Sequence, residues 1–259
     1  MVNNTFRAML REGRPAFGSW IQTGHTAVAE VMARAGFDWL AIDLEHSAID
    51  LETTFTLIQV IDLAGCVPLV RLSANDPVQA KRVMDAGAWG VIVPSVQSAA
   101  EAKQAVDAVK YPPQGARGVG LGRAHAYGPR FAEYFKTSGE QTVVIPMIEQ
   151  KEGVEHVEEI LQVPGVDGVF IGPYDLSASY GVAGELTNAI VRHAMQRVLA
   201  AARAAGKAAG IHVVHPPMAQ VTDRLSEGFR LIAYGGDMLF MTPAANEAGA
   251  WLRGLSARA

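Results

Sequence analysis

Short apolar runs alternate with longer amphipathic segments along the whole chain. The apolar runs are bounded by Gly, Pro or polar residues, which is typical of strands buried on both faces of a parallel sheet. We predict eight such strands, at residues 16–21, 39–44, 67–72, 90–96, 143–147, 169–171, 208–214 and 231–234. The segments after them have apolar residues at helical spacing and polar residues on the opposite side. They predict helices at residues 25–35, 51–64, 77–87, 99–109, 150–161, 186–205, 218–226 and 242–255.

Strand-then-helix units in unbroken succession predict an α/β fold, a single (β/α)₈ TIM barrel. The 259 residues suit one domain spanning the chain, because such a barrel needs about 250 residues. A doubly wound sheet is the alternative, but no GxGxxG motif follows the first strand. The long stretch at residues 111–128 is irregular and rich in Gly and Pro. We interpret it as a structured rim loop; a mobile insertion is the alternative.

Composition narrows the class of protein. With 49% hydrophobic and 19% charged residues, the chain can build a large core. A net charge of −4 without a long basic run argues against nucleic acid or an anionic membrane as partner. There is no apolar stretch of membrane-spanning length and no signal peptide, and the single Cys66 fits a reducing, cytoplasmic location. We interpret Cys66 as a small buried hydrophobe.

Polar residues gather where the predicted strands end. In a barrel those carboxyl ends share one rim, and catalytic residues lie there. The rim residues are Asp43, Glu45, His46, Arg71, Ser95, Gln97, Glu149, Asp175, His212, His215 and Asp237. Glu149 and Asp175 follow neighbouring strands, so their carboxylates should meet and form a site for a divalent metal. Pairing of the two acids with arginines is an equal alternative from the residues alone.

Other rim residues also have competing interpretations. His46 is a candidate functional histidine, because Asp43 lies three residues earlier and would orient it. Arg71 ends an apolar strand and must pair there with a carboxylate or an anionic substrate. His212 and His215 are interpreted as satisfied histidines, and Asp237 as the N-cap of the last helix. Asp85 lies near the end of a predicted helix, and from the helical periodicity alone we interpret it as a solvated acid.

Enzymes that act on carbonyl compounds can use a lysine Schiff base in place of a metal ion. The six lysines are Lys81, Lys103, Lys110, Lys136, Lys151 and Lys207. None falls at the carboxyl end of a predicted strand, which favours a metal-dependent route.

Five blocks of the sequence carry a family resemblance. They are FDWLAIDLEHSAID at residues 37–50, PLVRLSANDPVQAKRVMDAGAWGVIVPSVQSAAEA at 68–102, YPPQGARGVG at 111–120, MIE at 147–149 and GVDGVFIGPYDLSASYG at 165–181. In this order and spacing the chain resembles the HpcH/HpaI aldolase family, metal-dependent pyruvate aldolases that cleave 4-hydroxy-2-oxo acids. The blocks span most of the chain.

The resemblance implies roles for individual residues. Glu149 and Asp175 match the acids that hold Mg²⁺, Mn²⁺ or Co²⁺. Arg71 matches the arginine that stabilises the enolate oxygen, and His46 with Asp43 matches the catalytic base. Asp85 matches an acid that members contribute near the site.

The segment before the second metal ligand matches the family's pyruvate site. Gly172, Pro173, Tyr174 and Asp175 would bind the pyruvate carboxylate, through the amides of the last two. Many members have Gln at the position of Met147 and Ala at that of Tyr174, which bears on substrate scope.

The implied function is reversible cleavage of a 4-hydroxy-2-oxo acid to pyruvate and an aldehyde, in the breakdown of aromatic compounds. A divalent ion and Arg71 would stabilise the enolate, and His46 would take the proton of the C4 hydroxyl. Two alternatives stay open: a lyase for citryl- or malyl-type acyl-CoA esters, and a non-catalytic barrel. We expect residues 120–128, with Arg123, His125 and Tyr127, to line the aldehyde pocket.

The last predicted helix points to assembly. Trp251, Leu252 and Leu255 form an apolar stripe close to the C-terminus. The resemblance implies a homo-oligomer, a hexamer, in which the helix at about residues 242–255 is exchanged between subunits.

Overall fold

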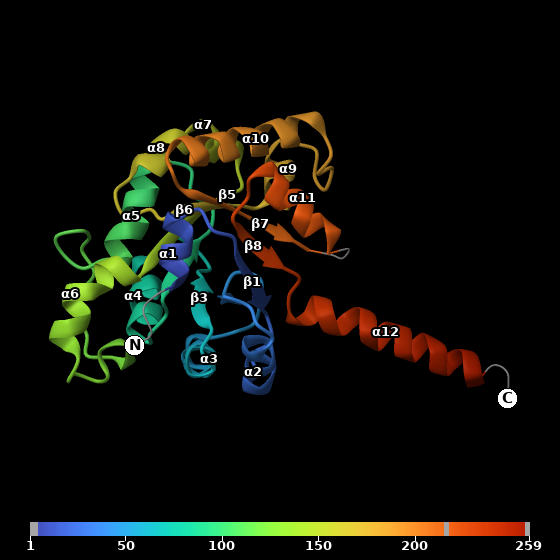
Figure 1. The fold of residues 1–259 in the computed structure, drawn as a ribbon, viewed down its shortest axis with the longest axis horizontal. Coiled ribbons are helices and arrows are strands. Elements are labelled where there is room, and N and C mark those ends of the chain that lie inside the picture. The colour runs from blue at the N-terminus through green and yellow to red at the C-terminus, as the bar shows by residue number, and fades with distance from the viewer. Residues whose placement is uncertain (1–4, 215–217, 257–259) are drawn as a thin grey trace.

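Eight parallel strands close into a barrel in the order of the sequence, with β1 paired to β8. The computed structural model describes residues 5–214 and 218–256. The strands are β1 (Ala16–Ile21), β2 (Trp39–Asp43), β3 (Val67–Arg71), β4 (Gly90–Val93), β5 (Val143–Ile148), β6 (Gly168–Ile171), β7 (Ala208–Val213) and β8 (Leu231–Tyr234). The predicted (β/α)₈ barrel is thereby confirmed (Figure 1).

Helices surround the strands. They are α1 (Thr5–Arg11), α2 (Thr26–Arg34), α3 (Leu51–Leu63), α4 (Pro77–Asp85), α5 (Ala99–Val109), the 3₁₀ turn η1 (Arg123–His125), α6 (Phe131–Gln141), α7 (Lys151–Glu155), α8 (Val157–Gln162), α9 (Pro173–Ser179), α10 (Ala189–Ala204), α11 (Ala219–Glu227) and α12 (Asp237–Ser256). The sequence did not predict α1, α6, α9 or the 3₁₀ turn. The helix predicted at 150–161 is two helices, and the last helix starts earlier than expected.

The interior of the barrel is filled by large side chains. Trp20, Trp39 and Phe170 are buried there, and Trp20 meets the other two rings edge-on. A Cβ on Gly18 would overlap the indole of Trp39, so glycine at this position makes room for the ring. The interior is therefore a packed core below the rim and leaves space for chemistry only at its end.

The amino-terminal end of the barrel is closed by α1. Phe6 and Leu10 on this helix are buried in the interior cluster. Between them Arg7 donates from Nε to Oδ1 of Asp167 at 2.7 Å and from Nη1 to the carbonyl of Gly139 at 2.8 Å. Although α1 looks polar in sequence, two apolar side chains and one buried ion pair hold it across the end of the barrel.

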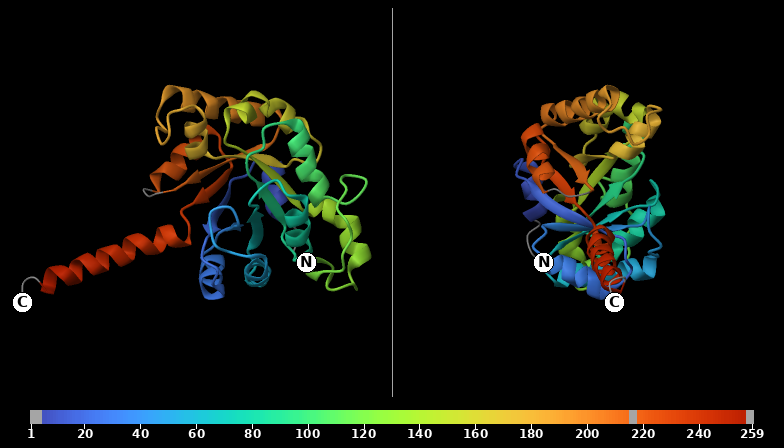
Figure 2. Two further views of the ribbon diagram at one scale, coloured as in Figure 1. Left: turned by 180° about the vertical axis from the view of Figure 1, so that it is seen from behind. Right: turned by 90° about the vertical axis from the view of Figure 1, so that its right-hand side faces the viewer.

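The last helix, α12, leaves the barrel and extends away from it (Figures 1 and 2). Its first turn lies against the end of β1, where Asp237 accepts backbone hydrogen bonds from Gln22 and Thr23. Asp237 is thus the first helical residue and binds a neighbouring loop as well as its own helix. Farther along, Trp251, Leu252 and others are exposed. Within the described residues, no helix combines the length and apolar character needed to cross a bilayer.

Candidate active site

An arginine and an aspartate are joined at the carboxyl ends of β2 and β3. Arg71 donates from Nε to Oδ1 of Asp43 at 2.9 Å and from Nη2 to Oδ2 at 2.6 Å. Asp43 is fully buried, and burial by itself raises its pKa. The hydrogen bonds and charge of Arg71 outweigh that effect, so the pKa of Asp43 lies below its ordinary value. Arg71 therefore has the carboxylate partner that its position in an apolar strand required.

Two residues of β1 and its following loop complete the environment of this pair. The guanidinium of Arg71 lies over the Trp20 ring, with 4.4 Å between Cζ and the ring centroid. The side-chain amide of Gln22 donates to Oδ2 of Asp43 at 3.1 Å. Sequence reasoning missed both residues, because neither is charged and their proximity to Arg71 depends on barrel closure.

His46 is arranged differently from the prediction. Asp43 accepts from the backbone N–H of His46 at 3.1 Å, and no hydrogen bond joins the carboxylate to the imidazole in the described part of the chain. The ring is exposed instead, and its Nε2 lies 3.9 Å from Oε2 of Glu45. Burial raises the pKa of Glu45 to about 6. In the structure, therefore, Glu45 is the acid beside the imidazole, while Asp43 fixes the turn that carries it.

Glu149 follows β5 and is buried. Its Oε1 accepts from the backbone N–H of Ser95 at 2.6 Å and from the Ser95 hydroxyl at 3.0 Å. Ser95 follows β4 and has a positive φ of 54°, which turns both donors toward the acid. A Cβ on Gly172 would lie 2.8 Å from Oε2 of Glu149, so a larger residue there would displace this oxygen. Burial raises the pKa of Glu149, and the charge of Asp175 adds to this.

Asp175 stands in the first turn of α9, directly beyond β6. The register aligns Ile148 with Ile171, which brings Glu149 beside Gly172 and close to this turn. Among the described residues no hydrogen-bond donor reaches either oxygen of Asp175 or Oε2 of Glu149. The alternative that arginines neutralise the two acids therefore finds no support in the contacts.

A cavity of about 420 Å³ lies at the carboxyl ends of the strands, beside these groups. His46, Arg71 and Asp175 line it together with Gly172, Pro173 and Tyr174. No group of three or more His, Cys, Asp or Glu side chains arranged for a metal occurs in the described chain. Two carboxylates with uncommitted oxygens fit a hard divalent cation such as Mg²⁺, which is often held by one or two protein acids while water and substrate complete its shell.

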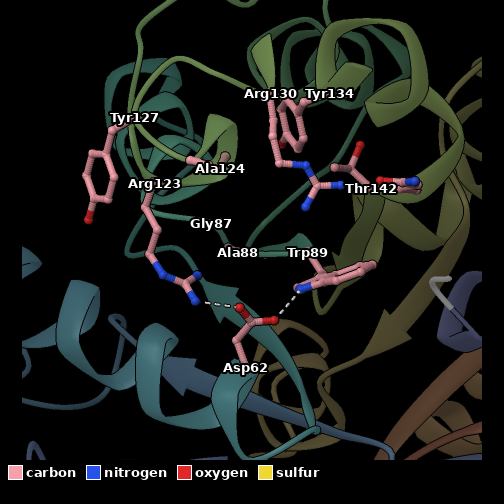
Figure 3. A pocket seen from close by; sticks show the side chains of 12 residues that line it. Asp62, Gly87, Ala88, Trp89, Arg123, Ala124, Tyr127, Arg130, Tyr134 and Thr142 are labelled. Atoms are coloured by element: carbon pink, nitrogen blue, oxygen red, sulfur yellow. Dashed lines mark hydrogen bonds and ion pairs between the residues drawn. The ribbon is translucent and has the colours of Figure 1, made fainter. Parts of the chain in front are cut away.

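Asp85 and the long loop lie elsewhere. Asp85 is the last residue of α4, and its Oδ1 accepts from Nη2 of Arg117 at 2.5 Å. Figure 3 shows Arg123 pointing to Asp62, which it binds at 2.5 Å, in a cavity also lined by Trp89 and Thr142. The last two residues precede β4 and β5, so this is the amino-terminal end of the barrel.

The expectation that residues 120–128 line the aldehyde pocket is thus wrong within one chain. The physical reason is connectivity: a segment after a helix and before the next strand returns to the amino ends of the strands. His125 is buried there, with its Nε2 2.9 Å from the hydroxyl of Tyr111, and burial lowers its pKa. Tyr127 is exposed.

Two histidines of the predicted rim and Cys66 remain to be placed. His212 Nε2 donates to the carbonyl of Gly235 at 2.7 Å. His215 lies outside the described residues. Cys66 is buried, as expected, and burial raises its pKa to about 12.

Fold and site together define an enzyme class: a barrel with paired acids and an anchored arginine at the catalytic rim. The family model described as HpcH/HpaI aldolase/citrate lyase matches residues 16–243, so the chain belongs to this family. A 4-hydroxy-2-oxo-heptane-1,7-dioate aldolase of Shigella sonnei is 42% identical over 246 residues, 94% of this chain and 93% of that protein. The predicted family and enzyme class, a carbon–carbon lyase, are confirmed.

Solved structures agree with this assignment. A family protein from Burkholderia cenocepacia has a TM-score of 0.91 and 36% identity, covering 96% of this chain and 99% of that one. A citrate synthase has a TM-score of 0.84 and 28% identity, covering 96% and 98%. Proteins with different reactions in their names thus share the architecture, so the substrate has to be argued from the site.

Proposed function

We propose that this protein is a divalent-metal-dependent aldolase that reversibly cleaves 4-hydroxy-2-oxo acids to pyruvate and an aldehyde. One observation carries the proposal: Arg71, fixed by Asp43, lines the same cavity as Asp175, close to Glu149. A positive group and two acids with uncommitted oxygens are what the reaction needs, because breaking the C3–C4 bond leaves negative charge on the 2-oxo oxygen of pyruvate.

Glu149 and Asp175 would hold the divalent ion, which supplies Lewis acidity toward the oxo acid when bound. Magnesium, manganese and cobalt all accept oxygen ligands, and the two acids do not choose among them. Ser95 fixes one oxygen of Glu149 and leaves the other for the ion. The raised pKa of Glu149 fits this role, because a buried carboxylate beside a second acid is stabilised by a cation.

Arg71 would stabilise the enolate oxygen of pyruvate as negative charge develops. Asp43 keeps the guanidinium in place before the substrate arrives, so little reorganisation is needed during reaction. The segment from Gly172 to Asp175 would bind the pyruvate carboxylate. His46, beside Glu45, would take the proton from the C4 hydroxyl in cleavage and return it in condensation.

The proposal also concerns the assembly of several chains into an oligomer. Asp85 lies at the opposite end of its own barrel, so it would act only at the site of a neighbouring chain. The exposed apolar residues of α12 support an oligomer, and we infer a hexamer in which this helix packs on another subunit. The barrel of residues 1–259 would remain one domain apart from the exchanged helix.

The test is proton exchange of pyruvate. Chelator-treated protein is incubated with pyruvate in D₂O, with and without Mg²⁺, Mn²⁺ or Co²⁺, and the methyl signal is followed by NMR. We expect exchange that depends on metal and is lost in Glu149→Ala and Arg71→Ala. The control Glu52→Ala, an exposed acid on α3, should exchange like the wild type.

Further assays on the same protein distinguish the two alternative functions. No exchange with any metal, also when an aldehyde is added, would reject the pyruvate aldolase. Release of acetyl-CoA from malyl-CoA would then identify an acyl-CoA lyase, and absence of both turnover and metal binding would identify a non-catalytic barrel.

A further inference from the structure

Asp85 stands at an unfavourable place for an acid. It is the last residue of α4, where the partial negative charge of the helix end opposes a carboxylate. Its side chain is 24% exposed, so water can solvate it without a further partner. The chain nevertheless supplies Arg117, whose side chain is fully buried and whose Nη2 donates to Oδ1 of Asp85. A buried arginine therefore holds an acid that reaches the surface.

The guanidinium of Arg117 is fixed by packing within its own chain. Its Cζ lies 4.6 Å from the centroid of the Tyr111 ring and 5.8 Å from that of Tyr134, and Nη1 donates to the Tyr134 hydroxyl at 3.3 Å. The backbone N–H of Arg117 donates to the carbonyl of Lys110, which ties the loop to the end of α5. Buried His125 supports both tyrosines: its Nε2 lies 2.9 Å from the Tyr111 hydroxyl, and its ring meets the Tyr134 ring edge-on.

Stability alone does not account for this arrangement. Removing a guanidinium from water is costly, and an apolar side chain would also pack between the two tyrosine rings. The contact has a clear use if the direction of the carboxylate matters, because it fixes Oδ1 of Asp85. No hydrogen-bond donor reaches Oδ2 in the described part of the chain. Gly120 passes beside this oxygen without a side chain, where a Cβ would lie 3.1 Å from it. Oδ2 thus remains available to a group outside the chain.

Resting on the proposed function and its assembly, we propose that Arg117 is a positioning residue for the active site of a neighbouring subunit. It orients Asp85, which lies at the far end of its own barrel and acts at the catalytic rim of the neighbour. Arg117 touches no substrate, and the cluster of Tyr111, His125 and Tyr134 acts only through it. A change at Arg117 should therefore impair the active site of a different chain from the one that carries it.

The first test compares two variants of the full-length, metal-loaded protein. Arg117→Met removes the charge and should lower kcat for pyruvate exchange in D₂O by ~10–100-fold, as is typical when the partner that orients a functional group is lost. Asp85→Asn should cause a similar loss. KM for pyruvate should stay near the wild-type value, because the groups proposed to bind pyruvate are intact. Arg117→Lys should recover part of the rate. Wild-type exchange in Asp85→Asn or Arg117→Met would overturn the proposal.

Arg7→Met is the control for a loss of stability. It also removes a buried arginine from an ion pair, the one with Asp167 at the amino-terminal end of the barrel. Its Tm should fall, as that of Arg117→Met should, while exchange by the folded protein remains like that of the wild type. An equal loss of exchange in Arg7→Met would show that Arg117→Met acts through stability, which would overturn the proposal.

Mixed oligomers show in which chain Arg117 acts. Two variants are co-expressed with different tags, and oligomers that carry both tags are purified. Arg71→Ala with Arg117→Met should recover about a quarter of wild-type exchange, because random assembly places an intact Arg71 beside an intact pair of Asp85 and Arg117 at about a quarter of the sites. Asp85→Asn with Arg117→Met should recover none, because each chain then contributes a defective acid. Arg71→Ala with Glu149→Ala, both within one site, is the control without recovery.

The reverse pattern would overturn the proposal. Recovery by Asp85→Asn with Arg117→Met, and none by Arg71→Ala with Arg117→Met, would assign Arg117 to the site of its own chain. Absence of recovery in every mixture would reject action between chains. These results differ from a failure of the proposed function, in which the wild type itself shows no exchange with any metal.

Discussion

Asp43 and Arg71 are register partners at the ends of β2 and β3, and two hydrogen bonds of 2.9 and 2.6 Å join their side chains. The pairing follows from strand register, because adjacent parallel strands place these residues side by side at the rim. It fixes the guanidinium plane and uses both oxygens of the buried acid. The arginine is therefore oriented before any substrate binds, which is the condition for stabilising a developing oxyanion efficiently.

Arg71→Lys should reduce metal-dependent pyruvate exchange by ~10²–10³, because an ammonium cannot form the two-pronged contact that orients the positive charge. The measurement is the NMR exchange rate under saturating metal. Arg34→Lys, an exposed arginine on α2, is the matched control and should be unchanged. A lysine variant that retained more than half of the rate would mean that orientation by Asp43 is unimportant.

Gly172→Ala should weaken metal binding without unfolding the barrel. The added Cβ would lie 2.8 Å from Oε2 of Glu149, the oxygen that we assign to the metal, and would displace it. Titration calorimetry with Mn²⁺ measures the affinity, and we expect a loss of about tenfold or more. Gly254→Ala is the control, because its added Cβ meets no atom within 4 Å. Unchanged Mn²⁺ affinity in Gly172→Ala would show that Oε2 of Glu149 is not a metal ligand.

Arg7→Ala should destabilise the barrel far more than Arg11→Ala, although both residues lie on α1. Arg7 forms a buried ion pair with Asp167, and breaking such a pair costs about 3–5 kcal/mol. Arg11 pairs with Glu140 at the surface, where the expected cost is about 0.2–1 kcal/mol. Urea denaturation of both variants measures the difference. Similar unfolding free energies would show that α1 does not close the barrel in solution.

The strands were predictable because hydrophobic burial alone places them. The predicted first and eighth strands coincide with β1 and β8, and the others differ by a few residues at their ends. Helix α6 was missed although Tyr134 and Ser138 on it are buried at helical spacing, because Gly139 interrupts the pattern and the Gly-rich loop precedes it. α9 was missed because its seven residues are too short to show a period.

From the sequence, the site could be predicted only as the group of polar residues that follow the strands. Placing Glu149 and Asp175 at one rim required no more than parallel connectivity. The partner of each side chain depends on rotamers and register, which is why Asp43 binds Arg71 and only the backbone of His46. The loop that contains Arg123 was assigned to the wrong end, although its position after α5 already implied the amino-terminal side.

Glu45 should make the stability of the metal-free protein depend on pH. Burial raises its pKa to about 6 from an ordinary value of 4.5, so the folded state binds this proton more tightly than the unfolded state. The resulting stabilisation is present below about 4.5 and is lost as the pH rises through about 6. The unfolding free energy of the wild type minus that of Glu45→Gln should therefore fall over this range and then level off. Denaturation in urea at several pH values checks this; a difference that rises with pH would contradict it.

The projecting helix α12 gives the last prediction, which concerns assembly. Trp251 is 66% exposed and Leu252 57% exposed on one chain, an arrangement that costs solvation free energy unless another surface covers them. If α12 packs on a neighbouring subunit, light scattering of the wild type at micromolar concentration should give several times the chain mass of 27.6 kDa. Trp251→Lys should lower that mass, because burying an ammonium in an apolar contact is unfavourable.

Leu63→Lys is the control for α12. Leu63 is 82% exposed at the end of α3, away from the projecting helix, and its replacement should leave the mass unchanged. A wild-type mass near 27.6 kDa would reject the exchanged helix. It would also remove Asp85 from the catalytic residues, because that acid lies at the far end of its own barrel and reaches a site only through a neighbouring chain.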